Sequence, residues 1–172
     1  MALFESIKYQ VVEKNGKIEI RKYNDFFLAS TKTLTNQALD SGFMNVFQYI
    51  SGSNDQNQKI SMTTPVVTYE EGKELITGFY VPSKFSKESI PHPIDNKVFI
   101  NEMKNSYYAV IRFRGSWRTE NFDKYDQLLL NYIQEMKLKI TSKRLIMRYQ
   151  PPFIPSFLRR NEIAYQIDYS TK

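Results

Sequence analysis

The sequence contains no cysteine. This absence excludes disulfide bonds, thiolate metal sites, iron–sulfur clusters, covalent c-type haem attachment and cysteine nucleophiles. It is typical of proteins from a reducing compartment. The first ten residues carry Glu5 and Lys8 and hold no long apolar run. We therefore expect no secretory signal peptide and a cytoplasmic location.

Histidine and glycine are also scarce, with one His and six Gly. A Ser-His-Asp triad would have to use His92, which lies between two prolines, and the chain has no Gly-x-Ser-x-Gly elbow. Zinc prefers nitrogen and sulfur ligands, which are nearly missing here. No glycine-rich phosphate loop occurs either. The sequence predicts a surface-loop histidine at position 92, no metal site and no enzyme.

No apolar stretch approaches the roughly 20 residues of a membrane-spanning helix, so we expect no membrane span. The net charge of +6 arises in residues 101–172, because charges balance over residues 1–100. Arg112, Arg114 and Arg118 alternate as exposed strand positions would. There is no basic run and no known docking element, so we expect a solvated basic face and no nucleic-acid partner.

Aromatic residues are abundant at 15% of the chain, with twelve Tyr and twelve Phe. Such side chains fill cores and also line pockets for planar ligands. The length of 172 residues suits one domain, and we expect a single, monomeric domain over residues 1–172.

Hydrophobic periodicity predicts the elements of this domain. Strands are expected within residues 16–33 and over residues 60–69, 75–81, 98–103, 107–117, 145–149 and 163–169. Helices are expected over about residues 38–50 and 122–139. The second helix should bury Tyr125, Leu128, Leu129, Tyr132, Ile133 and Met136 and place Lys137 and Lys139 at its negative C-terminal end.

The pattern divides into two pseudo-repeats, about residues 5–90 and 91–169, each with a helix between strands. Residues 47–50 and 130–133 also share a short similarity. The predicted fold class is α+β. A duplicated β-α-β-β unit forms a distorted antiparallel β-barrel with two long helices packed outside.

Two segments concentrate apolar side chains. Phe43, Met44 and Phe47 lie together on the first helix, and Phe153 and Phe157 lie in a late proline-rich loop. Exposed loop hydrophobes often mark a ligand or partner site. Plain core packing explains the same pattern, and the residues alone leave both interpretations open.

Four sequence blocks then resemble one family. They are residues 18–23 (IEIRKY), 47–54 followed by 60–66 (FQYISGSN and ISMTTPV), 91–95 (PHPID), and 149–152 followed by 155 and 159–163 (YQPP, P and RRNEI). The blocks occur in order and span nearly the whole chain. The sequence resembles the SOUL/haem-binding protein family.

The resemblance implies non-covalent binding of haem or another tetrapyrrole for storage, transport or buffering. In that family, the groove that binds the tetrapyrrole lies between the first helix and the loop before the last strand. Carried over, its lining is Phe43, Met44, Phe47, Phe153 and Phe157. The family's basic groove positions match Asn45, Gln48 and Ile154 here, which leaves Lys59, Arg159 and Arg160 as candidate contacts to the haem propionates. No axial histidine matches, so the candidates for an iron ligand are Met44 and His92.

Two alternatives stay open. The first is a small-molecule effector-binding or protein-interaction module without haem, because the duplicated architecture also resembles gyrase-inhibitor-like effector-binding domains. The second is an enzyme working in the groove, which would need a buried carboxylate such as Glu102 or Glu162. For Glu162, an ion pair with the neighbouring arginines is the favoured interpretation.

Overall fold

The computed structural model describes residues 4–34 and 39–170. The elements are β1 (Glu5–Ser6), β2 (Tyr9–Asn15), β3 (Ile18–Tyr23), β4 (Phe26–Leu34), α1 (Leu39–Ile50), β5 (Thr63–Thr64), β6 (Val66–Glu71), β7 (Glu74–Tyr80), β8 (Val98–Met103), β9 (Ser106–Arg114), α2 (Thr119–Glu135), β10 (Lys139–Ile140), β11 (Leu145–Arg148), the 3-10 turn η1 (Ser156–Leu158) and β12 (Arg160–Asp168). They form two compact units that interleave along the chain. Unit 1 comprises Met1–Ile7 and Asp25–Lys104, and unit 2 comprises Lys8–Asn24 and Asn105–Lys172.

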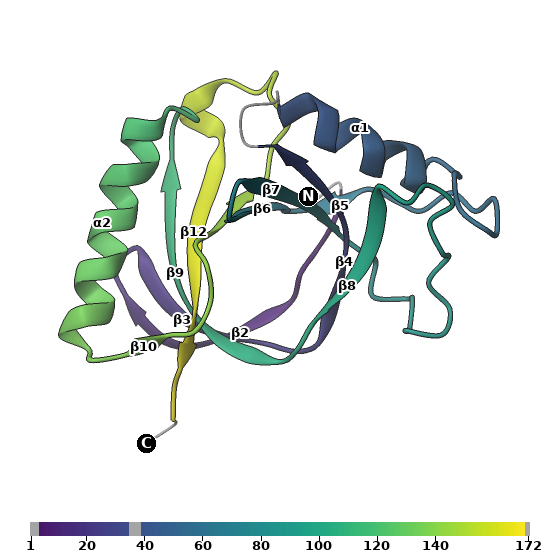
Figure 1. Cartoon of the computed structure of the whole chain (residues 1–172). Helices are drawn as coiled ribbons and strands as arrows, with labels where there is room; N and C mark the ends of the chain where they lie inside the picture. Colours follow the sequence, from purple (N-terminus) through teal and green to yellow (C-terminus); the bar gives the residue numbers. More distant parts are fainter. Residues whose placement is uncertain (1–3, 35–38, 171–172) are drawn as a thin grey trace. The chain divides into compact units, whose positions relative to one another are not determined.

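Unit 1 is an antiparallel sheet with the strand order β6-β7-β4-β8 and the helix α1 packed against it (Figure 1). The helix forms because its apolar residues recur at helical spacing and point toward β4 and β7. Val46, Tyr49 and Ile50 are buried and share a core with Ala29 and Phe79 of the sheet.

The end of α1 is fixed by a buried asparagine. Asn54 is fully buried and donates to the carbonyl oxygens of Tyr49 (3.1 Å) and Gln58 (2.8 Å). Its own side-chain oxygen accepts the backbone N–H groups of Gln56 and Gln58. The loop after the helix therefore closes around one side chain, which satisfies backbone groups that the end of the helix leaves free.

Unit 2 is an antiparallel sheet with the strand order β2-β3-β9-β12-β11, and the short strand β10 pairs with β12. The helix α2 packs on β9 and β12 (Figure 1). Phe122, Leu129 and Ile133 of the helix are buried against residues such as Ile111 and Ile163. Residues of β3, β9 and β12 that alternate with this core point to the opposite face, which carries the polar cluster described below.

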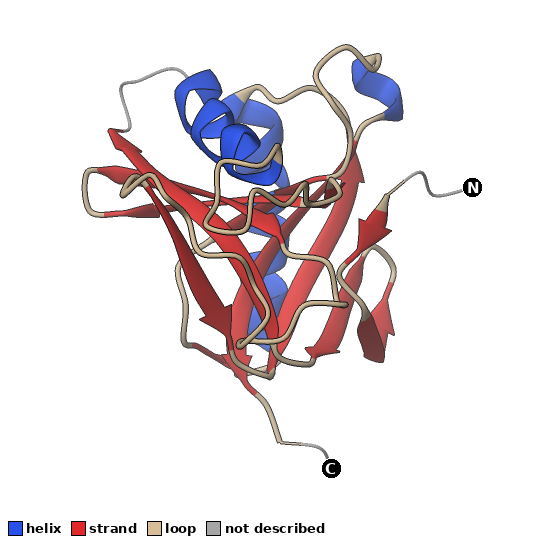
Figure 2. Cartoon of the chain, turned by 90° about the vertical axis from the view of Figure 1, so that its right-hand side faces the viewer, coloured by secondary structure: helices blue, strands red, loops and turns tan. Residues whose placement is uncertain are grey.

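The predicted fold class is confirmed at the level of an α+β protein with antiparallel strands and two helices; Figure 2 shows the prevalence of strands. Both units contain the succession strand–helix–strand–strand, as β4-α1-β6-β7 and β9-α2-β11-β12. The barrel closure, the duplication and the single domain stay predictions. The pseudo-repeats stay predictions as well; the two compact units are a different division of the chain, in which unit 2 includes β2 and β3.

Several predicted element limits were wrong. The strand expected over residues 60–69 is divided into β5 and β6 at Pro65, which has no N–H to offer a sheet. The second helix ends at Glu135; Lys137 follows with a positive φ of 55°, and Lys139 lies in β10. Neither lysine therefore occupies the last helical turn. The strand β2 was not predicted.

The expected apolar stripe of α2 is narrower than predicted. Leu129 and Ile133 are buried, whereas Leu128 and Met136 are 47% and 44% exposed. Leu128 lies on the exposed side of the helix and Met136 follows its last residue, so hydrophobicity alone did not reveal which face is covered.

Candidate functional site

An apolar strip on α1 is not covered by the core of unit 1. Met44 is 48% exposed and Phe47 is 38% exposed. The Phe43 ring is partly buried, stacks on Phe47 at 5.8 Å between centroids and meets Phe79 at 5.3 Å. The helix therefore buries one face and presents a second apolar strip. All three residues predicted on this helix lie on or beside that strip.

The segment 151–158 of unit 2 exposes aromatic rings. Phe153 is 82% exposed and Phe157 is 69% exposed, while Leu158 is 48% exposed. Isolated surface hydrophobes are common, but several large ones in one short segment are typical of a ligand or partner site. The rings of Phe153 and Phe157 are thus both exposed from one short segment.

Arg159 holds the shape of this segment. Its Nε donates to the carbonyl oxygen of Ile154 at 2.8 Å, and its Nη2 donates to that of Pro152 at 2.6 Å. The guanidinium also lies over the Trp117 ring, 4.5 Å from the centroid. Trp117 is itself fixed, because its indole N–H donates to Asn161 at 2.9 Å. The exposed rings therefore project from a segment whose backbone is tied to the sheet.

The candidate propionate contacts differ in their surroundings. Arg159 is engaged as described, and Arg160 donates to Glu162 at 2.8 Å and stacks over Tyr149 at 4.0 Å. Lys59 is exposed, and its ammonium group has no hydrogen bond or ion pair within the described part of the chain. Of the three cations, Lys59 alone has a side chain that internal contacts leave available.

The main polar centre of unit 2 was not predicted in full. Glu162 and Arg21 are both completely buried. Arg21 donates two parallel hydrogen bonds of 2.9 Å to the two carboxylate oxygens of Glu162. Tyr149 donates its hydroxyl to the same carboxylate at 2.9 Å, and Arg112 approaches it to 3.4 Å. We call Arg21, Arg112, Tyr149, Arg160 and Glu162 the arginine–glutamate cluster.

Electrostatics keep this cluster charged. Burial alone would raise the pKa of the Glu162 carboxyl, but hydrogen bonds from Arg21 and the charges of Arg21 and Arg160 hold that pKa below its ordinary value. Burial likewise opposes the charge of Arg21, yet its bonds to Glu162 and Tyr23 raise its pKa. The Tyr149 hydroxyl stays neutral, because burial and the adjacent carboxylate raise its pKa. Glu162 is therefore an ionised hydrogen-bond acceptor at neutral pH.

Neither carboxylate considered for an enzyme offers free acid–base chemistry. The predicted ion pair between Glu162 and Arg160 is confirmed, and the remaining lone pairs of Glu162 are shared with Arg21, Arg112 and Tyr149. Glu102 pairs with Lys104 at 2.8 Å. A general base needs a lone pair directed at a substrate. The contacts of Glu162 use both of its oxygens, whereas the ion pair of Glu102 uses one.

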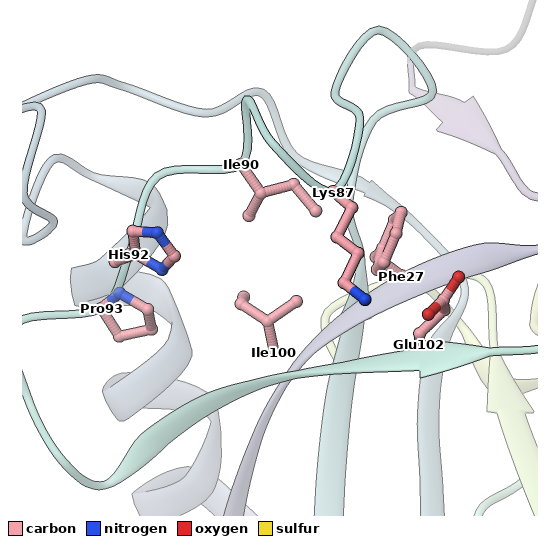
Figure 3. A pocket seen from close by; sticks show the side chains of 7 residues that line it. All are labelled: Phe27, Lys87, Ile90, His92, Pro93, Ile100 and Glu102. Carbon is pink, nitrogen blue, oxygen red and sulfur yellow. The ribbon is translucent and has the colours of Figure 1, made fainter.

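A surface hollow of about 330 Å³ lies in unit 1. It is lined by Phe27, Lys87, Ile90, His92, Pro93, Ile100 and Glu102 (Figure 3). His92 is exposed and sits in a surface loop, as predicted. The hollow was not predicted as a site, because its residues come from three segments that no sequence motif connects.

Within residues 4–34 and 39–170, no three His, Asp or Glu side chains come close enough together to hold a metal ion. No helix in the same residues is both long and apolar enough to cross a membrane.

The sequence and its fold can be compared with known protein families. The family model described as "SOUL heme-binding protein" matches residues 4–166. The chain therefore belongs to the SOUL heme-binding protein family.

Curated relatives carry corresponding names. The chain is 32% identical over 110 residues to "Heme-binding protein 2" of Homo sapiens, covering 58% of this chain and 53% of that protein. It is 25% identical over 180 residues to "Heme-binding protein 1" of Sus scrofa, covering 94% of each. The chain thus spans about half the length of the human protein in the first alignment and nearly all of the pig protein in the second.

Among solved structures, the C-terminal domain of EcmrR has a TM-score of 0.67 at 10% identity, covering 94% of this chain and 99% of that domain. At this identity the likeness concerns the fold alone.

Proposed function

We propose that this protein binds haem or another tetrapyrrole non-covalently, as a monomer that stores, transports or buffers the ligand in the cytoplasm. The family match over residues 4–166 is the observation that carries the ligand class. No catalytic step is part of this proposal.

The proposed lining is the apolar strip of α1 together with segment 151–158, that is Phe43, Met44, Phe47, Phe153 and Phe157. Their exposure supports the assignment, since a porphyrin ring needs apolar surface that the protein's own core does not use. Burial of such surface contributes about 25 cal/mol per Å². Haem would supply a large planar apolar surface and an iron centre with open coordination positions.

For the polar parts of haem, the surroundings of each side chain suggest an order of preference. We propose Lys59 as the first contact for a propionate, because Arg159 and Arg160 already serve loop carbonyls and Glu162. Met44 is the preferred iron ligand, since its thioether lies one helical turn from Phe47 on the exposed strip. His92 is the alternative.

A hemin titration followed in the Soret region tests the proposal. We expect a shifted band that saturates near one equivalent. Phe153→Asp should weaken hemin affinity by about tenfold or more, because a carboxylate then faces an apolar macrocycle. Phe153 is 82% exposed, so this variant should fold. Phe47→Asp should have the same effect on α1.

Leu128→Asp is the matched control, since Leu128 is a comparably exposed apolar residue on α2. An unshifted spectrum, or equal losses in the control, would contradict the proposal. Thermal stabilisation by other hydrophobic compounds in the absence of hemin binding would instead favour an effector-binding module.

A further inference from the structure

We propose that the hollow of unit 1 is a second ligand site, for a small flat apolar molecule that ends in a carboxylate. This site shares only His92, the alternative iron ligand, with the residues proposed for the tetrapyrrole. Its volume of about 330 Å³ lies at the low end of the usual range for small-molecule sites, roughly 300–1,000 Å³, and suits a body of one or two rings.

The floor of the hollow is apolar and is formed by residues that the core of unit 1 holds in place. Ile90 is 3% exposed and belongs to the core of unit 1, and Ile100 and Phe27 pack against that core. Phe27 stands opposite Glu102 in the β4–β8 ladder, and Ile100 lies two residues along the same strand. Side chains two residues apart on a strand share a face, so the register of β4 and β8 fixes this part of the floor.

The two ends of the hollow are held by hydrogen bonds. At one end, the backbone N–H of His92 donates to the Asp55 carboxylate at 2.8 Å, and the N–H of Asp55 returns a bond of 2.9 Å to the His92 carbonyl oxygen. At the other end, Lys87 lies in a turn closed by the N–H of Ile90 donating to Ser86 at 3.0 Å. A ligand would therefore meet a largely preformed surface, which lowers the entropic cost of binding.

The charged side chains that line the hollow favour an anionic ligand. Figure 3 shows Lys87 and Glu102 at one end, His92 and Pro93 at the other, and Ile90 and Ile100 between them. Glu102 is already paired with Lys104 at 2.8 Å. The Lys87 ammonium and the His92 imidazole have no hydrogen bond or ion pair within the described residues. Lys87 thus carries the one ammonium of the lining, and no carboxylate of the described residues contacts it directly, although Glu88 in the same turn acts on it at longer range.

This arrangement defines the orientation of the ligand. The carboxylate would meet Lys87, the rings would cover Ile90 and Ile100, and the far edge would contact His92 and Pro93. A cationic group on the ligand would be repelled by Lys87, and Glu102 would attract it less than a free carboxylate would, because Glu102 already pairs with Lys104.

The test uses 2-naphthoate and its uncharged counterpart 2-naphthamide, with the ring signals of His92 observed by NMR. The chain has one histidine, so these signals are unambiguous. We expect a saturable shift with 2-naphthoate. Lys87→Gln should weaken 2-naphthoate about threefold to fivefold, as for a solvent-exposed ion pair, and leave 2-naphthamide unchanged. Lys73→Gln, at an exposed lysine in the β6–β7 turn, should change neither affinity.

An absent His92 shift, or equal weakening of both probes by Lys87→Gln, would overturn the proposal. Weakening of 2-naphthoate by Phe153→Asp would also overturn it, since the probe would then occupy the proposed tetrapyrrole surface. Hemin titrations of the Lys87→Gln variant should match those of the unchanged chain. Failure of this site and failure of tetrapyrrole binding are therefore separate results.

Discussion

At position 162 the chain places a carboxylate where no water reaches it, and three guanidinium groups share it. Buried ion pairs gain little net stability from their charges, but removing one partner leaves the other as a buried charge with less compensation. The ion pair between Glu162 and Arg160 was predictable, since residues two apart on a strand share a face. Arg21 was not, because only the pairing of β3 with β9 and of β9 with β12 brings it to Glu162.

Replacing the carboxylate tests this dependence. Glu162→Gln removes the carboxylate that accepts two hydrogen bonds from the buried Arg21 and leaves Arg21 only its ion pair with Glu19 at 2.7 Å, so we expect the free energy of unfolding to fall by about 3 kcal/mol in urea titrations. Glu102→Gln breaks an exposed pair and should cost no more than about 1 kcal/mol. If both variants lost the same small amount, the cluster would not matter for stability.

At the scale of elements, periodicity predicted both helices and most strands but not where they end. The end of α2 depends on the positive φ of Lys137, which no hydrophobic pattern encodes. The apolar composition of segment 151–158 was visible, whereas its exposure was not, because an apolar loop folded onto a sheet has the same composition. The candidate lining was thus predicted from the family resemblance, whereas the hollow beside His92 could be recognised only in the three-dimensional structure.

The fixed shape of segment 151–158 gives an element-level prediction. Arg159→Ala removes the bonds to the carbonyl oxygens of Pro152 and Ile154 and the contact with Trp117. We expect faster proteolytic cleavage and faster amide exchange within residues 151–158, with the melting temperature nearly unchanged. Arg144→Ala, at an arginine paired with Asp126, serves as the control. Equal cleavage rates in the two variants would show that Arg159 does not hold the segment.

For the whole molecule, the arginine–glutamate cluster links stability to pH. The pKa of Glu162 is lower in the folded chain than its ordinary value of 4.5, so the unfolded chain binds more protons at this site. Stability from Glu162 is therefore complete above about pH 4.5 and is lost as the pH falls through the folded pKa.

We expect the urea midpoint to fall between pH 6 and pH 3, and to fall less steeply in Glu162→Gln. Midpoints measured at several pH values for both chains check this. Parallel curves would mean that other carboxyl groups account for the acid sensitivity.

The interleaving of the two units also bears on how the protein is made. The strand β3 pairs with β9, whose paired residues follow 83 to 93 positions later, and Arg21 bonds to Glu162, which follows 141 positions later. A ribosome therefore releases the opening hairpin long before its sheet neighbours exist, while residues 25–104 can already assemble their own strands. Until β9 has been made, the β2–β3 hairpin of a nascent chain therefore exposes the strand edge that β9 later covers.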